Sequence, residues 1–475
     1  MLKRVWARRG FLTLSVVALN TGGLPAQVGF GGPGGFGSGR TNAANVSAQP
    51  GDNPSGIGIS PFVGVSGTYN RELGDLNNNE GTFYGRAATW GASGYAGVTG
   101  EKNWSHTALG FGYTFAGNYW PYSQSKFTQN HVVHLGVSHI ATPRLSFSAN
   151  QFAGTTIGGY GYGAGFAGVG GFGGFSSFGL GSLGSGAGLG LGGLGSLNQN
   201  GIVDSEVVNA RTNFYGGVGE VSYRLSERWT ASAAAGVSFV RRSHSLFGND
   251  WLYAAGELAY SIDARSQIGF IYQHSWVNYP NYFGEVLGQV AGVEYSRQLS
   301  TRTMFSVFVG GLAVRSTFVG TVPIDPEIAA LLGTSTTYSI QKVQYYSSSF
   351  GGHFVTSRGR NSYSASAYRG ISPGNGLLLA GVRDVATLNY GYSGNGKIGF
   401  SLGASAIRDN GVVGVRKAAL NYTVYAATGY RLFNQIFWHI SAGWRNQQFS
   451  GQPDRQAVFA STGFTWSPRE NLFHF

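Results

Sequence analysis

Two neighbouring stretches, KAALNYTVYAATGYRL (417–432) and QIFWHISAGWRNQ (435–447), decide the fold class. In both, apolar and polar residues alternate one by one, which is the period of a β-strand with one apolar and one wet face. Both stretches are longer than twelve residues. Strands of soluble proteins have about 5–6 residues, whereas long amphipathic strands suit a tilted crossing of a bilayer. We therefore predict membrane-spanning strands.

The same alternation recurs elsewhere in the chain. Apolar residues share one face in 109–115, 398–406 and 458–466, while small and polar residues share the other face. The alternation changes phase within 209–225, which predicts a β-bulge. In 286–299 and in 340–356 the pattern does not show which residues lie on the apolar face and which on the wet face.

Connections between the strands alternate between tight turns and longer loops. Eight tight turns and nine longer loops predict 18 strands, within a range of 16–20. An even number places both chain ends on the side of the tight turns, and closure of the sheet removes its unpaired edges. The predicted fold is all-β: an antiparallel transmembrane β-barrel with short periplasmic turns and longer outer loops.

The composition agrees with this fold class. Charged residues make up 11% of the chain and aromatic residues 14%, with 79 Gly and no Cys. Soluble domains have about 25% charged residues. Without Cys, a disulfide framework and a thiolate metal site are excluded. The formal net charge is +12, but the basic residues are scattered along the chain, which argues against a nucleic-acid partner.

The first residues have the layout of a secretory signal peptide. Basic residues precede an apolar run at 10–19, and small residues offer a cleavage site after Ala26. The apolar run is too short for a spanning helix, which needs about 20 residues. We therefore predict a signal peptide (1–26), a Gly/Pro/Ser-rich periplasmic lead-in (27–56) and an outer-membrane β-barrel (57–475).

With these features and its terminal aromatic residue, Phe475, the chain resembles bacterial outer-membrane β-barrels of the general porin type. Such barrels commonly end in an aromatic residue that acts as an insertion signal, so the resemblance implies this role for Phe475. The last predicted strand ends at Trp466, ahead of Pro468, which is awkward in a strand. Trp466 is therefore the alternative carrier of the signal.

A Gly-rich segment, 158–205, forms the third long loop. In general porins the third outer loop folds into the barrel and narrows the channel, and by its position this segment resembles that loop. It departs from the resemblance because it is uncharged as far as Val203 and so lacks the acidic residues of a polar constriction. A disordered surface loop is the alternative. The candidates for a constriction or a plug are its aromatic residues: Tyr160, Tyr162, Phe166, Phe172, Phe175 and Phe178.

Four basic residues fall on the wet face of neighbouring predicted strands: Arg383, Lys397, Arg431 and Arg445. A basic arc on the wall of a pore would raise the local concentration of anions. Inward acids are scarce on these strands, and Asp409 is the candidate. The alternative is that the basic charges satisfy one another or water without selecting ions.

No group of residues predicts catalysis or ligand chemistry. The histidines of 131–139 point to alternate faces or lie too far apart to converge on a metal. The segment 391–397 (GYSGNGK) lacks the Ser/Thr and the helix of a phosphate-binding loop. His439 and Ser441 share a predicted inner face, as polar residues do in any barrel. We predict no enzymatic activity, no catalytic or metal-binding residue and no cofactor.

These observations favour an outer-membrane channel for the passive diffusion of small solutes, with a preference for anions as a further hypothesis. The alternative is a non-conducting barrel that acts as an anchor or as a component of an export or assembly complex. The expected partners are outer-membrane lipid, the barrel-insertion machinery and small solutes. A homo-oligomer is left open.

Overall fold

The computed structural model describes most of the predicted barrel. The described residues are 58–72, 89–121, 127–157, 211–243, 248–280, 282–372, 381–394, 397–411, 418–433, 435–449, 455–467 and 473–474. The predicted signal peptide, the lead-in, the Gly-rich loop and Phe475 lie outside these residues.

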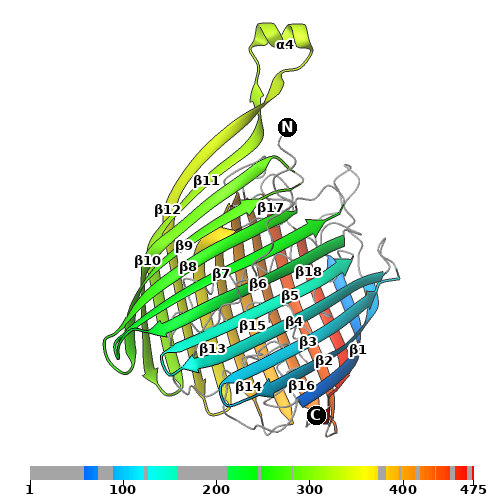
Figure 1. Ribbon diagram of the computed structural model, residues 1–475. Coiled ribbons are helices and arrows are strands. Elements are labelled where there is room, and N and C mark those ends of the chain that lie inside the picture. Colours follow the sequence, from blue (N-terminus) through cyan, green and yellow to red (C-terminus); the bar gives the residue numbers. More distant parts are fainter. Residues whose placement is uncertain are drawn as a thin grey trace.

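Long β-strands account for nearly all of the described chain (Figure 1). In order they are β1 (Gly58–Glu72), β2 (Thr89–Asn103), β3 (Thr107–Tyr119), β4 (Phe127–Thr142), β5 (Leu145–Ile157), β6 (Arg211–Arg224), β7 (Trp229–Arg242), β8 (Asn249–Ser261), β9 (Ser266–Asn278), β10 (Gly284–Ser300), β11 (Thr303–Pro323), β12 (Thr336–Arg358), β13 (Asn361–Ser372), β14 (Gly381–Ser393), β15 (Ile398–Gly411), β16 (Ala418–Arg431), β17 (Ile436–Phe449), β18 (Arg455–Trp466) and the short β19 (Phe473–His474).

The sheet closes on itself. Each long strand pairs antiparallel with its neighbours in sequence, and β1 pairs with β18 from Val63–Trp466 to Glu72–Ala457. The two residues of β19 pair with Gly58 and Ile59, at the start of β1. The 18 long strands therefore form a closed antiparallel β-barrel, which confirms the predicted fold class and strand number.

The two ends of the barrel differ. At the end that we call the turn end, successive strands are joined by short turns, such as 104–106, 225–228 and 262–265. The opposite end, the loop end, carries the ribbon of β11 and β12, which rises beyond the other strands and is capped by the helix α4 (Pro326–Leu332) (Figure 1). Among the described residues, no helix is long and apolar enough to cross a membrane.

The predicted faces of the C-terminal strands are confirmed. Trp438 and Ile440 of β17 are exposed on the outer face, whereas His439 and Ser441 are buried on the inner face. In β16, Asn421 faces inward in the same way. Side chains on the inner face of a barrel are shielded by the wall, so burial follows the alternation of the sequence.

The predicted β-bulge in 209–225 is wrong. Strand β6 pairs with β5 without interruption from Leu145–Tyr223 to Ile157–Arg211. The change of phase in the sequence arises because Val218 faces inward, where it packs against a cluster of buried apolar side chains. Apolar residues on the inner face shift the apparent phase of the alternation, as the extra residue of a β-bulge would.

The barrel wall has a second layer at β10, a strand for which the sequence pattern did not show which residues face inward. Strand β12 pairs with β13 only from Phe350–Arg369 to Arg358–Asn361, so its upper part separates from β13. The upper end of β13 lies against the inner face of β10, where a Cβ on Gly288 would be only 2.3 Å from Cδ1 of Ile371. Glycine at position 288 therefore leaves the space that Ile371 occupies.

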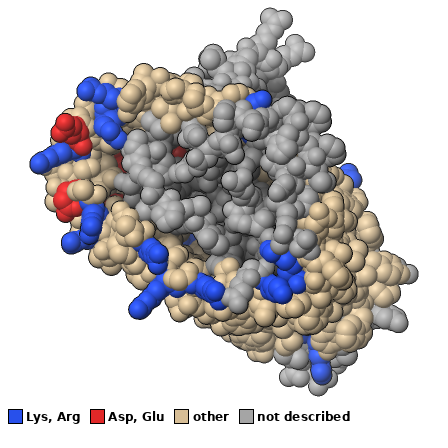
Figure 2. Space-filling view, turned by 90° about the horizontal axis from the view of Figure 1, so that it is seen from below, with Lys and Arg blue, Asp and Glu red and all other residues tan. Residues whose placement is uncertain are grey.

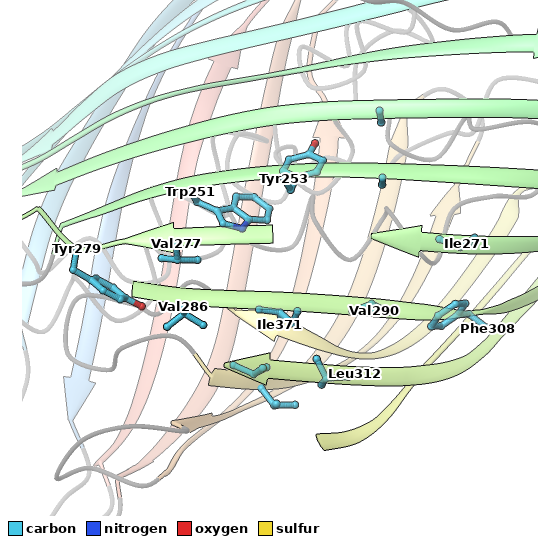
Figure 3. Close-up of a cluster of buried hydrophobic side chains, with 14 of the residues drawn as sticks. Trp251, Tyr253, Ile271, Val277, Tyr279, Val286, Val290, Phe308, Leu312 and Ile371 are labelled. Atoms are coloured by element: carbon cyan, nitrogen blue, oxygen red, sulfur yellow. The ribbon is translucent and has the colours of Figure 1, made fainter. Parts of the chain in front are cut away.

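A cluster of buried apolar side chains packs at this overlap (Figure 3). Val286 and Val290 of β10, together with Leu312 of β11, meet Ile371 of β13 and Val382 of β14. The cluster continues along β8 and β9 through Trp251, Tyr253, Ile271 and Val277, and includes Tyr279, which follows β9. These strands read as apolar on both faces because their inner face packs against protein rather than against water.

Candidate functional site: the barrel lumen

One side of the inner wall carries three carboxylates. Glu220 of β6, Glu257 of β8 and Glu294 of β10 all lie on inward positions and are 1%, 7% and 2% exposed. The carboxylate of Glu257 lies over Gly269 of β9, which pairs with Glu294. The three alternate strands thus bring three acidic side chains to one region of the wall.

The other side of the inner wall carries basic residues. Arg383 of β14 is buried and binds Asp409 of β15 with two hydrogen bonds, Nε to Oδ1 at 2.6 Å and Nη2 to Oδ2 at 2.9 Å. Arg445 of β17 is also inward and buried. Strand β8 and strand β17 lie nine strands apart in the closed ring of 18, so Glu257 and Arg445 lie on opposite walls.

The four predicted basic residues do not lie at one level. Arg383 and Arg445 lie in the half of the wall near the loop end. Arg431 is the last residue of β16, at the turn end, where its guanidinium lies 5.1 Å from the ring centroid of Phe437. Lys397 is exposed in the bend before β15, and its carbonyl accepts a hydrogen bond from the backbone N–H of Arg431. The structure therefore places them as two pairs, separated along β17 by about 27 Å at ~3.4 Å per residue.

A second ion pair lies on the outer parity of the same strands. Arg369 of β13 contacts Asp384 of β14 at 3.0 Å, and Asn410 of β15 donates a hydrogen bond to the same carboxylate at 3.5 Å. The side chains of Arg369 and Asp384 are 25% and 28% exposed, compared with 3% and 9% for Arg383 and Asp409. The two ion pairs thus differ in burial and in hydrogen bonding, since only Arg383 and Asp409 are joined by two hydrogen bonds.

Of the two candidates for an insertion signal, only Trp466 lies among the described residues. It ends β18, opposite Val63 of β1 and Ile436 of β17. Its indole N–H donates a hydrogen bond to the side-chain oxygen of Gln435 at 3.1 Å. Trp466 therefore lies at the turn end, beside the seam that closes the barrel. The aromatic residues of the Gly-rich loop lie outside the described part of the chain.

The polar residues that were considered for catalysis or metal binding lie separately on the inner and outer faces of the wall. The hydroxyl of Ser441 hydrogen-bonds with that of Ser461 at 2.7 Å, although His439 shares its face. His134 is buried on the inner side, while His131 and His139 bind Tyr113 and Thr107 on the other face. No group of three or more His, Asp or Glu in the described ranges could hold a metal ion.

The sequence pattern did not predict the inward positions of Glu220 and Glu294. The phase of Val221 and Tyr223 places Glu220 on the inner face, but the incorrect bulge concealed it. Glu294 lies in a strand to which no face could be assigned. The alternation of Val293 and Tyr295 with Glu294 was the signal that could have found it.

Comparisons with known proteins give structural likeness at low sequence identity. No family model matches the chain, and no curated protein matches it. It is similar to the outer membrane protein OpdK from Pseudomonas aeruginosa, with 9% identity over 86% of this chain and 99% of that chain and a TM-score of 0.39. It is also similar to OccK2 (OpdF) from Pseudomonas aeruginosa in complex with glucuronate, with 10% identity over 86% and 98% of the chains and a TM-score of 0.40. OccAB2 from Acinetobacter baumannii is similar at 8% identity, over 86% and 98%, with a TM-score of 0.37.

Proposed function

We propose that the protein is an outer-membrane channel for the passive diffusion of small solutes. The observation that carries the proposal is a closed barrel of 18 long strands with an apolar outer face and with buried polar and ionisable side chains on its inner face. Closure lets neighbouring strands satisfy each other's backbone hydrogen bonds within lipid, although β12 pairs with β13 only over Phe350–Arg358. The lumen of the barrel would give small polar solutes a route across the membrane, because the apolar core of the bilayer is a barrier to them.

The outer face supports a location in a membrane. Trp104, Trp229 and Phe433 are exposed at the turn end, and Trp90 and Phe127 are exposed at the loop end. Aromatic residues at both ends of an apolar wall are typical of the girdles that outer-membrane barrels place at the two membrane interfaces. Between the two girdles, the outer wall exposes aliphatic side chains: Val133, Leu135, Leu252, Val307, Leu402 and Ile440.

The preference for anions remains part of the proposal. Arg445 on the inner wall, together with Lys397 and Arg431 at the turn end, would raise the local concentration of anions along one side of the pore. Arg383 contributes less, because Asp409 neutralises it. The acidic wall of Glu220, Glu257 and Glu294 opposes the preference.

Two further roles complete the proposal. The Gly-rich loop, 158–205, would narrow or plug the lumen through its aromatic residues. Phe475 or Trp466 would carry the signal that the insertion machinery recognises, after export by the signal peptide. Both roles rest on sequence position, and for Trp466 also on its place at the end of β18 beside the closing seam.

Planar bilayers provide the test. The purified protein should give stepwise conductance, and a salt gradient should give a reversal potential on the anion-selective side. Arg445→Gln should move the reversal potential toward cations, whereas Glu257→Gln, the matched change on the opposite wall, should move it toward anions. If both variants leave the reversal potential unchanged, these side chains do not line the path of the ions.

A non-conducting barrel is the second candidate, and one observation favours it. Some inward side chains are almost fully buried, with His439 and Ser441 each 1% exposed. A filled lumen would give this burial without any open path. Absence of conductance steps in protein that is folded and inserted would support this candidate over the channel.

A further inference from the structure

The turn end of the barrel is rich in cations. Figure 2 shows Lys and Arg side chains spaced around the rim when the molecule is seen from this end. Five successive tight turns, from β4–β5 to β12–β13, each carry an exposed arginine. We call them the turn arginines: Arg144, Arg228, Arg265, Arg302 and Arg358. The remaining tight turns, before and after these five, each have a lysine or an arginine at a strand end or beside it.

Acids do not balance this charge within the described part of the rim. Three ion pairs, Arg241–Asp250, Arg369–Asp384 and Arg383–Asp409, lie toward the loop end. At the five turns the acidic residues are Glu227 and Asp263. The carboxylate of Asp263 is engaged locally, because it accepts a hydrogen bond from the backbone N–H of Arg265 at 2.6 Å.

The turn arginines lie directly beside the aromatic girdle. Nη1 of Arg228 donates a hydrogen bond to the hydroxyl of Tyr260 at 3.1 Å, and the ring of Tyr260 lies 4.9 Å from that of Trp229. At the β2–β3 turn, Nζ of Lys102 lies 5.3 Å from the ring centroid of Trp104. Tyr and Trp lie at the headgroup level of a bilayer. Cations beside them are therefore at the depth of lipid phosphates.

We propose that the turn arginines bind the phosphate groups of anionic phospholipids in the membrane leaflet at the turn end. A cation near an anionic membrane surface contributes about 1 kcal/mol to the attraction, and the arginine fork matches the oxygens of a phosphate. The ring of arginines would give the barrel a shell of bound anionic lipid at one end. The inference rests on insertion into a membrane, and it does not require that the barrel conducts.

The loop end offers a matched control. Arg71, Arg211, Arg315 and Lys342 are exposed cations of the strands at that end. They are interspersed with acids such as Asp250 and Glu285, and they form no comparable ring. Removing four cations from either end changes the net charge equally, so a difference between the two variants reports position rather than total charge.

Native mass spectrometry of the folded barrel released from nanodiscs tests the proposal. The nanodiscs contain equal amounts of phosphatidylglycerol and phosphatidylcholine, and the lipids that leave with the protein are counted. We expect the wild type to retain mainly phosphatidylglycerol. The variant R144Q/R228Q/R302Q/R358Q should lose this enrichment, by about fivefold for each cation that contacts a phosphate. The variant R71Q/R211Q/R315Q/K342Q should keep it.

Equal retention of the two lipids by the wild type overturns the proposal. An equal loss in both variants also overturns it, because total charge would then be sufficient. Unchanged lipid retention with altered conductance in the turn variant would assign the arginines to the pore mouth instead. If the fourfold variant does not fold, R144Q/R228Q and R302Q/R358Q carry the same comparison. A barrel that retains phosphatidylglycerol but never conducts would contradict the proposed channel function and would still support this inference.

Discussion

Strands β14–β18 and strands β10–β13 build the same wall in different ways. Strands β14–β18 have 12 to 14 residues each and form a wall of one sheet. There Leu402 and Ile440 are exposed outside, and Ser401 and His439 are buried inside. Strands β10–β13 have 17, 21, 23 and 12 residues, and β12 leaves β13 halfway along.

The difference shows when alternation reports the faces of a strand. In β14–β18 the inner face meets polar side chains, so apolar residues occur on alternate positions. In the overlap of β10–β14 the inner face meets a second layer of protein, and apolar residues such as Leu312 occupy it as well. A strand that packs on both faces loses the period of two.

The largest expected effect concerns the buried ion pair of the regular region. Asp409→Asn leaves Arg383 buried without its counter-charge, which should cost about 3–5 kcal/mol of unfolding free energy. Asp384→Asn removes the acid of the more exposed pair on the neighbouring rung and should cost only about 0–1 kcal/mol. Urea unfolding in phospholipid vesicles measures both. Equal losses would show that burial does not separate the two pairs.

Next in size is the apolar overlap. Leu312→Ala removes a side chain that is 2% exposed, and we expect a loss of about 2–5 kcal/mol. Leu402→Ala, on the lipid-facing side of β15, is the control and should lose less, because lipid fills the space that the side chain leaves. The same urea titration compares them, and a larger loss for Leu402→Ala would contradict the packed overlap.

A smaller effect should follow from overfilling the overlap. Gly288→Ala places a methyl group against Ile371, the flexible end of which can shift, so we expect a cost of about 1–3 kcal/mol. Gly311→Ala, on the exposed face of β11 where a Cβ would meet nothing within 4 Å, serves as the control. The double variant Gly288→Ala/Ile371→Val should recover part of the loss, and no recovery would place the strain elsewhere.

The smallest effect belongs to a turn that lies outside both regions. Asp263 accepts a hydrogen bond from the backbone N–H of Arg265, which lowers its pKa below the usual 3.8. The ionised form is therefore the stabilising one. Its contribution is present above the pKa of the unfolded chain and is lost as the pH falls through the lower pKa of the folded state. Asp263→Asn should be less stable than the wild type at pH 7, and the difference should shrink below about pH 4.

Particular residues show how far the sequence could be interpreted alone. The faces of Trp438, His439 and Ser441 were predicted correctly, because each follows from its neighbours in one strand. The inward position of Glu220 was not predicted, because Val218 shares its face and concealed the alternation. Arg383 and Asp409 were both assigned inward. Their bidentate pair depends on the register of β14 against β15, which no single strand reveals.

The sequence by itself determined that the chain forms long amphipathic strands, how many there are, and which faces of β16–β18 meet lipid. These are local properties, since the backbone turns successive side chains to opposite faces. Only the tertiary structure decided which inner residues meet. Closure through β1 and β18 places the acids of β6–β10 opposite Arg445, and the departure of β12 from β13 buries Ile371 on Gly288. Such contacts join strands that are far apart in the chain, so they depend on register and closure rather than on any local period.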